Sequence, residues 1–400
     1  MSTHSDVIVV GAGLVGMFAA TELANQGIQV GLIDYRSPSE LLEGLTAEVL
    51  LFREHYQGTL EGMHVKSREI LLDFIEKQTG GMRTESFAEL QLIVAPANVE
   101  AAKRDAGRWH RQGVPVEYLS ASEIKNLDSG VSPEVMGALL YHDITGVDSE
   151  ALYRALFKVC ESDQRILKYW RVKVLGLNVK NGRTVGLRSS IGPLQAGQVL
   201  LASGIGTMGV FTSTGVQMPP VPEKTYRLVG QLIDKGPDRI VTEYILPGSF
   251  AYRSDAKEDS GFYVRISACI RKGQQTSVGE AREFVLVNNN GSSDQAATDA
   301  ITRHFAVRMP GYENLIFDNL ISRFNCFIPD GLPIVGPAPN VEALFFALYQ
   351  RDCRSMIGPA LGNLAAQTMI AQKTLEGMED LSPERFPQSA PGGRKKSFGE

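Results

Sequence analysis

Three glycines near the N-terminus form the strongest chemical signal in the sequence. The stretch "DVIVVGAGLVGMFAATELANQGIQVGLIDYR" places Gly11, Gly13 and Gly16 in a G-x-G-x-x-G pattern after four apolar residues. Such glycines permit a tight turn, a close approach of the backbone to a pyrophosphate, and close packing of a helix on a strand. The helix that follows offers unpaired N–H groups and positive potential to phosphates at its N-terminus. The pattern therefore predicts a nucleotide-binding βαβ unit.

The second predicted strand of this unit ends on an acidic residue. Asp34 comes eighteen residues after Gly16, and its carboxylate can accept hydrogen bonds from the hydroxyl groups of an adenosine ribose. The motif alone does not distinguish FAD from NAD. The other cofactor contacts expected in this unit are Ala12, Leu14, Val15, Tyr35 and Arg36.

The elements that position this unit are predicted from periodicity and turn residues. Residues 66–80 read as an amphipathic helix, and "SASEIKNLDSG" begins a helix with a serine cap followed by a glutamate. Asn181 and Gly182 predict a β-hairpin, and "QVLLASG" reads as a short buried strand. From about residue 220 to 290 the pattern is mostly strands, followed by a helix, a last strand in "ALFFALYQ" and a closing helix. The chain therefore alternates α/β segments around a strand-rich middle.

The composition excludes several classes of function. Forty Lys and Arg against forty-five Asp and Glu give a net charge of -5 and an isoelectric point near 5.8, which argues against dedicated nucleic-acid binding. A small-molecule partner is favoured. The four cysteines have no C-x-x-C spacing, so they predict neither a metal site nor a disulfide framework, and reduced thiols fit a cytoplasmic protein. They are Cys160, Cys269, Cys326 and Cys353.

Targeting segments are not expected either. The first apolar segment is already a strand signal by Val7, which leaves no room for a secretory signal peptide. The longest apolar-rich run, residues 357–371, is interrupted by glycine, proline, asparagine and glutamine. Such a run is too broken to cross a bilayer. The sequence therefore predicts no transmembrane segment and a cytoplasmic location.

Several motifs together resemble the D-amino acid oxidase-type flavoproteins, the superfamily of glycine oxidase, sarcosine oxidase and D-amino acid dehydrogenase. Beside the glycine motif these are "VKVLGL", "QVLLASG", "PPVPEKTYRLVGQLI" and "CFIPDGLPIVGPAPNVEALFFA", and the resemblance covers about residues 5 to 375. It implies FAD as the cofactor. It also implies an α/β fold in which a Rossmann-type FAD-binding domain is interleaved with a mixed-sheet α+β substrate domain.

The resemblance also predicts how the chain divides. Residues 1–80, 145–215 and 325–378 are expected to form the discontinuous FAD-binding domain, and residues 81–144 and 216–324 the substrate domain. Residues 379–400 are expected to be a mobile tail. By resemblance Val174 contacts the adenine, and Ala202, Ser203 and Gly204 line the FAD site. Further cofactor contacts implied by the resemblance are Asp330, Ser355, Met356 and Ile357.

The sequence departs from the family pattern at three places. Glu48 stands where a glycine is expected near the pyrophosphate and flavin. Asn325 occupies the position of the arginine that binds the substrate carboxylate in glycine oxidase, although Arg323 is two residues away. The Gly-His-containing loop before the last helix is replaced by residues 349–354. The candidate substrate-binding residues are Arg323, Arg265, Asn325 and Gln350, and Tyr252 is a candidate catalytic residue on a strand of the expected cavity.

The replaced loop suggests a role for its arginines. In the family this loop lies beside the flavin pyrimidine, where negative charge accumulates on reduction. Arg354 or Arg351 would stabilise that charge by direct Coulomb attraction and act as a catalytic group. The alternatives are a surface ion pair of one arginine with Asp352 and a loss of normal flavin chemistry.

These observations predict an FAD enzyme that removes a hydride from a carbon bearing an amine or amino-acid nitrogen. Two alternatives stay open: oxidation of a 2-hydroxy acid, and a flavin-poor structural subunit of a hetero-oligomeric oxidoreductase. His55 could accept a proton or attach the flavin, but its context favours a surface or hydrogen-bonded histidine. Cys326 lies three positions closer to the Pro-Asp pair than the flavin-linked cysteine of sarcosine oxidase, which favours noncovalent FAD and a packed thiol.

Overall fold

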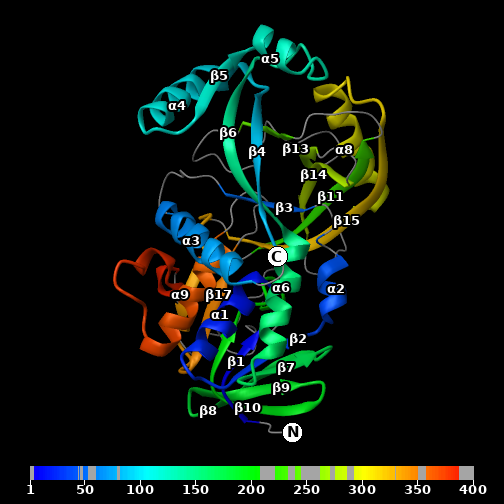
Figure 1. Ribbon diagram of the computed structural model, residues 1–400. Coiled ribbons are helices and arrows are strands. Elements are labelled where there is room, and N and C mark those ends of the chain that lie inside the picture. The colour runs from blue at the N-terminus through cyan, green and yellow to red at the C-terminus, as the bar shows by residue number, and fades with distance from the viewer. Residues whose placement is uncertain are drawn as a thin grey trace, which may run out of the picture.

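The polypeptide folds around two β-sheets, which lie at opposite ends of an elongated molecule (Figure 1). The computed structural model describes residues 4–43, 45, 48–52, 60–78, 82–207, 221–232, 239–244, 262–270, 275–285, 292–328, 330–349 and 357–386. Among these residues, no helix combines the length and the hydropathy that crossing a membrane requires.

The first sheet has a parallel centre. Its strand order is β16-β17-β10-β1-β2-β7, and β9 pairs with β10 and β8 at one side. The strand β1 lies parallel to both β2 and β10, β2 is parallel to β7, and β10 is parallel to β17. Its strands are β1 (His4–Val10), β2 (Val30–Asp34), β7 (Ile166–Trp170), β8 (Val174–Lys180), β9 (Arg183–Ser189), β10 (Gly192–Leu201), β16 (Ile334–Pro337) and β17 (Leu344–Leu348).

The central strands are apolar because both faces of a parallel sheet are covered. All five residues of β2 are buried, as are all five of β17. Helices α1 (Leu14–Asn25), α6 (Ser149–Ser162) and α9 (Gly358–Ala371) share one hydrophobic cluster with α3 (Glu61–Lys77) and with side chains from β1 and β2. The short helix α2 (Pro38–Glu43) follows β2. This arrangement places the N-termini of two helices, α1 and α9, beside the parallel strands.

The second sheet is mixed. Its strand order is β15-β11-β14-β13-β12-β4-β6-β3, and β5 pairs with β6. Most neighbours are antiparallel, but β12 runs parallel to β4. Its strands are β3 (Val49–Phe52), β4 (Thr84–Ile93), β5 (Val116–Ser120), β6 (Gly137–Asp148), β11 (Val221–Leu232), β12 (Arg239–Glu243), β13 (Tyr263–Ile270), β14 (Gln275–Phe284) and β15 (Leu315–Phe327).

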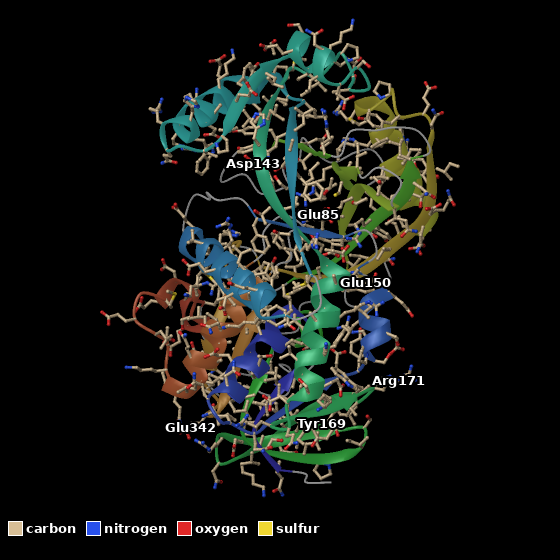
Figure 2. The ribbon with its side chains drawn as sticks, in the orientation of Figure 1. Glu85, Asp143, Glu150, Tyr169, Arg171 and Glu342 are labelled. Carbon is tan, nitrogen blue, oxygen red and sulfur yellow. The ribbon has the colours of Figure 1, made fainter. Side chains whose placement is uncertain are left out.

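Helices cover the second sheet at its far end and on one face. The helix α8 (Asp294–Arg308) packs on β13 and β14, while α4 (Val99–Arg111) and α5 (Ala121–Leu127) lie with β5 at the end away from the first sheet (Figure 1). A 3-10 turn, η1 (Pro96–Asn98), precedes α4. Glu150, in the first turn of α6, lies between the two sheets (Figure 2).

Several local predictions are confirmed. The hairpin between β8 and β9 turns at Asn181 and Gly182, with φ of 51° and 76°, which is the left-handed backbone that a tight hairpin turn needs. Ser120 caps α5, and Glu123 returns a hydrogen bond to the Ser120 backbone, so the capping box is complete. Both features follow from local residue chemistry, which is why the sequence reveals them.

The first part of the predicted tail has defined structure. Residues 379–386 contain two 3-10 turns, η3 (Glu379–Leu381) and η4 (Pro383–Arg385). Leu381 is buried in the cluster that contains α9, and Arg385 binds Asp330 with a distance of 2.8 Å between Nε and Oδ2. These contacts were not apparent from the Pro- and charge-rich composition. Residues 387–400 lie outside the described ranges.

Candidate functional site

In the glycine turn between β1 and α1, Gly11 and Gly16 have no room for a side chain, whereas Gly13 borders open space. A Cβ atom on Gly11, whose φ is +106°, would lie 2.7 Å from the Ala202 carbonyl oxygen, and one on Gly16 would lie 1.8 Å from the Gly11 oxygen. No atom lies within 4 Å of the same position on Gly13. Gly13 is also the N-cap of α1 and provides no side-chain cap. The turn is therefore open toward a ligand where the positive end of the helix begins.

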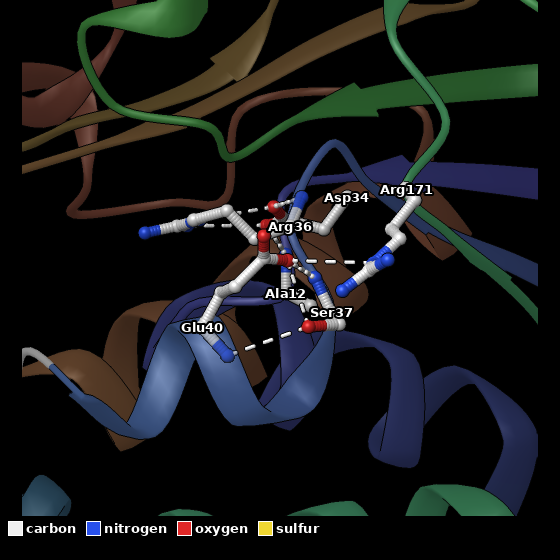
Figure 3. Close-up of polar contacts among 6 residues, drawn as sticks. All are labelled: Ala12, Asp34, Arg36, Ser37, Glu40 and Arg171. Carbon is white, nitrogen blue, oxygen red and sulfur yellow. Dashed lines mark hydrogen bonds and ion pairs between the residues drawn. The ribbon is translucent and has the colours of Figure 1, made fainter.

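Asp34 closes this turn from the end of β2 (Figure 3). The residue is 4% exposed. Its Oδ2 accepts hydrogen bonds from Ala12 N at 2.9 Å and Arg36 Nη2 at 3.2 Å, and its Oδ1 accepts from Arg36 N at 2.9 Å and Nε at 3.1 Å. An ionised carboxylate has about four acceptor positions. A ribose hydroxyl that binds Asp34 therefore replaces a hydrogen bond from the Arg36 guanidinium.

The residues after Asp34 form a charged edge to the site. Burial lowers the pKa of Arg36, but the hydrogen bond and charge of Asp34 outweigh it and hold the pKa above its ordinary value. The guanidinium carbon lies 5.0 Å from the centre of the Tyr35 ring, which is itself 62% exposed. Glu40 then accepts hydrogen bonds from the Ser37 backbone and hydroxyl at the start of α2 (Figure 3).

The N-terminus of α9 lies against the N-terminus of α1. A Cβ on Gly358 would be 2.6 Å from Leu14 Cδ2, and one on Gly362 would be 2.6 Å from the Val15 carbonyl oxygen. Two helices can approach this closely because these positions have no side chain. Ile357, the N-cap of α9, is fully buried. The positive ends of both helices therefore converge on one region.

Ala202 and Ser203, two other predicted cofactor positions, lie at the same turn. Ala202 N donates to the Val10 carbonyl at 2.8 Å, which attaches the end of β10 to the end of β1. Ser203 shares a hydrogen bond of 2.9 Å with the Thr207 hydroxyl, and Gly204 has a φ of +55° with open space at its Cβ position. Val174 begins β8, which reaches the sheet through β9.

A tyrosine on α6 also reaches this region. The Tyr153 hydroxyl oxygen accepts a hydrogen bond from Leu14 N at 3.1 Å, and the side chain is buried. Nothing in the local sequence of α6 marks this contact, because the two residues are 139 positions apart.

The second sheet presents a charged surface, which we call the charged face. Cross-strand pairing aligns Arg265 with Glu280 and Glu280 with Arg227, and it aligns Thr225 with both Arg282 and Arg323. Because side chains alternate between the two sides of a strand, these residues share one side. The members of the charged face are Glu223, Thr225, Arg227, Arg265, Glu280, Arg282, Arg323 and Asn325.

Ion pairs fill much of the charged face. Glu280 Oε2 lies 2.9 Å from Arg265 Nη2 and 3.1 Å from Arg282 Nη2. Glu48, which precedes β3, lies 2.9 Å from Arg227 Nη1 and 3.4 Å from Arg323 Nη1. All of these residues except Arg265 line a small pocket, whose walls are Glu48, Thr225, Arg227, Glu280, Arg282, Ile321, Arg323 and Asn325.

Glu48 connects this pocket to the nucleotide end of the molecule. Its carbonyl oxygen accepts a hydrogen bond from Ser149 N at 2.9 Å, at the start of the helix that carries Tyr153. The Glu48 side chain is 4% exposed. A glycine at position 48 would leave Arg227 and Arg323 without this carboxylate, so the departure from the family pattern is structurally coupled to the arginines of the pocket.

The structure places the predicted substrate-binding residues in different situations. The Arg323 side chain is 27% exposed and lines the pocket, whereas the Arg265 side chain is 9% exposed and holds Glu280. Asn325 also lines the pocket, and its Nδ2 donates to Thr225 Oγ1 at 3.0 Å. Arg323 is thus the most accessible of these arginines.

Asp330 and Cys326 have surroundings that indicate no direct part in catalysis. Asp330 makes its ion pair with Arg385, and burial raises its pKa while Arg385 and the Leu332 N–H lower it below the ordinary value. The Cys326 thiol is buried, and burial raises its pKa to about 12, which suits a packed thiol rather than a nucleophile. The predictions for Arg351, Arg354, Tyr252, Gln350, Ser355, Met356 and His55 concern residues outside the described ranges.

Sequence reasoning missed Tyr153 and most of the charged face. Arg227 and Arg282 stand in strands whose alternate residues are apolar, as in "TYRLV" and "GEAREF". Buried charges in the middle of such strands are unusual unless they are paired. That alternation was the available signal, but it does not reveal which strands are neighbours.

A family model described as FAD dependent oxidoreductase (DAO) matches residues 6–368. The chain belongs to this family. Its cofactor is FAD, as the resemblance implied. The residues present fit that group: the turn is open at Gly13, Asp34 ends the second strand, and the N-termini of α1 and α9 converge beside them.

The chain is distantly similar to several characterised flavoproteins. It is 22% identical to glycine oxidase of Pseudomonas aeruginosa, with 97% of this chain and 99% of that protein covered. It is 25% identical to monomeric sarcosine oxidase of Bacillus sp. (strain B-0618) over 256 residues, which cover 62% of this chain and 63% of that protein. The structure of glycine oxidase from Geobacillus kaustophilus matches with a TM-score of 0.78 at 18% identity, covering 96% of this chain and 100% of that chain. The predicted fold class is confirmed.

Proposed function

We propose that this FAD-dependent oxidoreductase oxidises the C–N bond of an amine or amino acid that carries a carboxylate. FAD would supply the chemistry by accepting a hydride from the carbon that bears the nitrogen, and the substrate, after losing a proton from the nitrogen, would become an imine. The relatives named above are oxidases of glycine and of sarcosine, which are both small amino acids. The choice of substrate depends on the residues of the pocket.

The observation that supports a carboxylate is the set of arginines in the pocket. Arg227, Arg282 and Arg323 line it together with two glutamates, Glu48 and Glu280. Arg323 combines the most exposed side chain of the three with a comparatively long contact of 3.4 Å to Glu48. A guanidinium matches the two oxygens of a carboxylate, and in a partly dehydrated pocket this contact is strong.

The pocket residues then have distinct roles in this proposal. Arg323 binds the substrate carboxylate, and Glu48 limits where the guanidinium can point. Asn325 is neutral and directed to Thr225, so it does not replace an arginine as the carboxylate ligand. Ile321 provides an apolar wall, which reduces the access of water. No protein nucleophile is required for a hydride transfer of this kind.

An anaerobic screen tests the proposed reaction. The FAD-loaded protein is mixed without oxygen with amines, amino acids and 2-hydroxy acids, and the loss of the absorbance of oxidised flavin is followed. Amino acids should bleach the flavin, whereas amines of the same skeleton without the carboxylate should be much slower. Faster bleaching by 2-hydroxy acids than by the matching amino acids would instead support the hydroxy-acid alternative, and no bleaching by any compound would contradict both reactions.

A substitution tests the role of Arg323. Arg323→Gln should raise the substrate concentration for half-maximal flavin reduction by about tenfold or more, because hydrogen bonds to charged groups contribute roughly 1.5 to 3 kcal/mol. Arg303→Gln on the exposed side of α8 is the matched control and should leave that concentration unchanged. An unchanged value in Arg323→Gln would exclude Arg323 as the carboxylate ligand.

A further inference from the structure

The N-terminus of α1 is contacted by a tyrosine hydroxyl. Gly13 provides no side-chain cap, and the Leu14 amide donates instead to Tyr153 Oη at 3.1 Å. The Tyr153 side chain comes from the second turn of α6 and is 6% exposed. Its ring makes an edge contact with Phe157, with 6.2 Å between the ring centres. Packing therefore fixes the direction in which the hydroxyl points.

The hydrogen-bonding capacity of this hydroxyl is half used. A phenol has one O–H donor as well as acceptor lone pairs. The oxygen accepts from Leu14 N, which leaves the O–H proton to be donated. Within the ranges that the structure describes, this proton has no acceptor. A buried polar group without a partner is costly, so an O–H in this place is expected to meet a ligand atom.

The surroundings of the hydroxyl suit an anion. Burial raises the pKa of the Tyr153 phenol above its ordinary value, and the charge of Asp34 adds to this increase. The charges of Arg323 and Arg36 and the hydrogen bond from Leu14 N act in the opposite direction, as they would for a bound anion. Those two arginines come from the charged face and from the residues that follow Asp34. The pyrophosphate of a dinucleotide binds at the N-terminus of the helix after the glycine turn.

We propose that Tyr153 is a pyrophosphate-binding residue of the FAD site, which accepts the Leu14 N–H and donates its own O–H to a phosphate oxygen. The side chain thus extends the hydrogen-bonding capacity of the helix N-terminus through a hydroxyl fixed on a second helix. This inference concerns cofactor binding and is independent of the substrate proposed above.

The test measures how tightly the FAD-free protein binds ligands that carry phosphates and a ligand that does not. Tyr153→Phe keeps the ring and its contact with Phe157 but removes the hydroxyl. The Kd of FAD and of ADP, measured by calorimetry, should rise about tenfold or more, as expected for a lost hydrogen bond to a charged group. The Kd of adenosine, which has no phosphate, should not change.

A control and a second variant keep the outcome clear. Tyr312→Phe removes another buried hydroxyl, bonded to Asp128 in the other sheet region, and should leave the Kd of ADP unchanged. Unchanged ADP binding in Tyr153→Phe would show that Tyr153 only caps the helix, and tighter ADP binding would show that its hydroxyl blocks the phosphate position. Should Tyr153→Phe not fold, 3-fluorotyrosine at position 153 makes the O–H a stronger donor. ADP should then bind more tightly, and an equal or weaker affinity would overturn the proposal.

Discussion

The two sides of the second sheet carry opposite kinds of residue on the same strands. On β11, Tyr226 and Leu228 are buried against α8, while Thr225 and Arg227 belong to the charged face. On β14, Ala281 faces the helix and Glu280 and Arg282 face the pocket. We call the side of the sheet that packs on α8 the apolar face. Its members are Tyr226, Leu228, Val264, Ile266, Val278 and Ala281, with Ala297, Ala300, Ile301 and Phe305 of α8 packed on them.

The apolar face stabilises the fold in the ordinary way. Burial of apolar side chains contributes roughly 1.5 to 3 kcal/mol for each large residue, and α8 packs four buried side chains on this face. The fully buried Tyr226 ring adds an edge contact with Phe262, with 5.6 Å between centres. Its hydroxyl reaches Glu283 and Ser292.

The charged face makes no comparable contribution to stability. Removing two charges from water costs several kcal/mol for each ion, and their attraction roughly restores that amount. Apolar residues of similar size would stabilise the sheet equally well or better. The difference teaches that one strand can serve two purposes, because the residues on one of its sides hold the fold and the alternate residues on its other side form a site. The following predictions separate these purposes.

The largest effect is expected on the apolar face. Phe305 is 4% exposed and makes an edge contact with Tyr312, at 6.4 Å between ring centres. Phe305→Ala should lower the free energy of unfolding by about 3 to 5 kcal/mol, because it removes buried area and leaves a cavity. Denaturant unfolding of the FAD-free protein measures this, and the FAD affinity of the folded protein should stay near that of the parent.

Val307→Ala on the same helix is the control. Val307 is 48% exposed, so its truncation should change the free energy of unfolding by no more than about 0.5 kcal/mol. If Phe305→Ala were as mild as the control, or if it weakened FAD binding tenfold, the apolar face would not be a separate structural side of the sheet.

An intermediate effect is expected on the charged face, and it should be partly reversible by a second substitution. Glu280→Leu removes the carboxylate shared by Arg265 and Arg282 and should destabilise the protein by about 3 kcal/mol, because breaking a buried pair leaves a charge poorly compensated. In Arg265→Met/Glu280→Leu part of this loss should be regained, because Arg265 no longer leaves an uncompensated charge, whereas Arg282 still lacks the Glu280 carboxylate.

The double variant also distinguishes stability from function. If the charged face exists for the site, Arg265→Met/Glu280→Leu should be more stable than Glu280→Leu but no less impaired in anaerobic flavin reduction. Losses that simply add in the double variant would mean that the two residues do not interact, contrary to the 2.9 Å contact between them.

The sequence predicted features that depend on local chemistry and missed those that depend on remote pairing. The turn at Gly11, Gly13 and Gly16 was predictable, because each glycine is required by backbone conformation or close contact within one βαβ unit. The hairpin at Asn181 and the cap at Ser120 were predictable for the same reason.

The charged face depends instead on register between strands far apart in the chain. Arg323 lies across from Thr225, and Glu48 is 179 positions from Arg227. Alternation within β11 indicates that one side is polar, but not that β14 and β15 are its neighbours. The Tyr153 contact is likewise set by how α6 packs on α1, which no periodicity reveals.

The smallest expected effect concerns Glu223 at the edge of the charged face. It is a pH-dependent change in the free energy of unfolding, which shows whether this side chain is charged or neutral. Glu223 is fully buried, and its Oε1 is 4.0 Å from Arg282 Nη1. Burial raises the pKa of Glu223 above the ordinary 4.5, although the charge of Arg282 opposes this. The native protein therefore holds this proton more tightly than the unfolded chain does. The contribution of this proton to the stability of the folded protein is fully present below about pH 4.5. It is lost as the pH rises through the pKa that Glu223 has in the folded state.

Glu223→Gln removes this titration while keeping the size of the side chain. Its free energy of unfolding should differ little from that of the parent near pH 4 and should exceed it increasingly toward pH 7, because the parent alone then carries a buried carboxylate. Denaturant unfolding at pH 4, 5, 6 and 7 measures the difference, with Glu313→Gln on the exposed surface as a control that should show no such trend. If Glu223→Gln is less stable than the parent at pH 7, Glu223 is ionised and belongs to the ion pairs. The charged face would then depend on all of its carboxylates, and its separation from the apolar face would be less sharp.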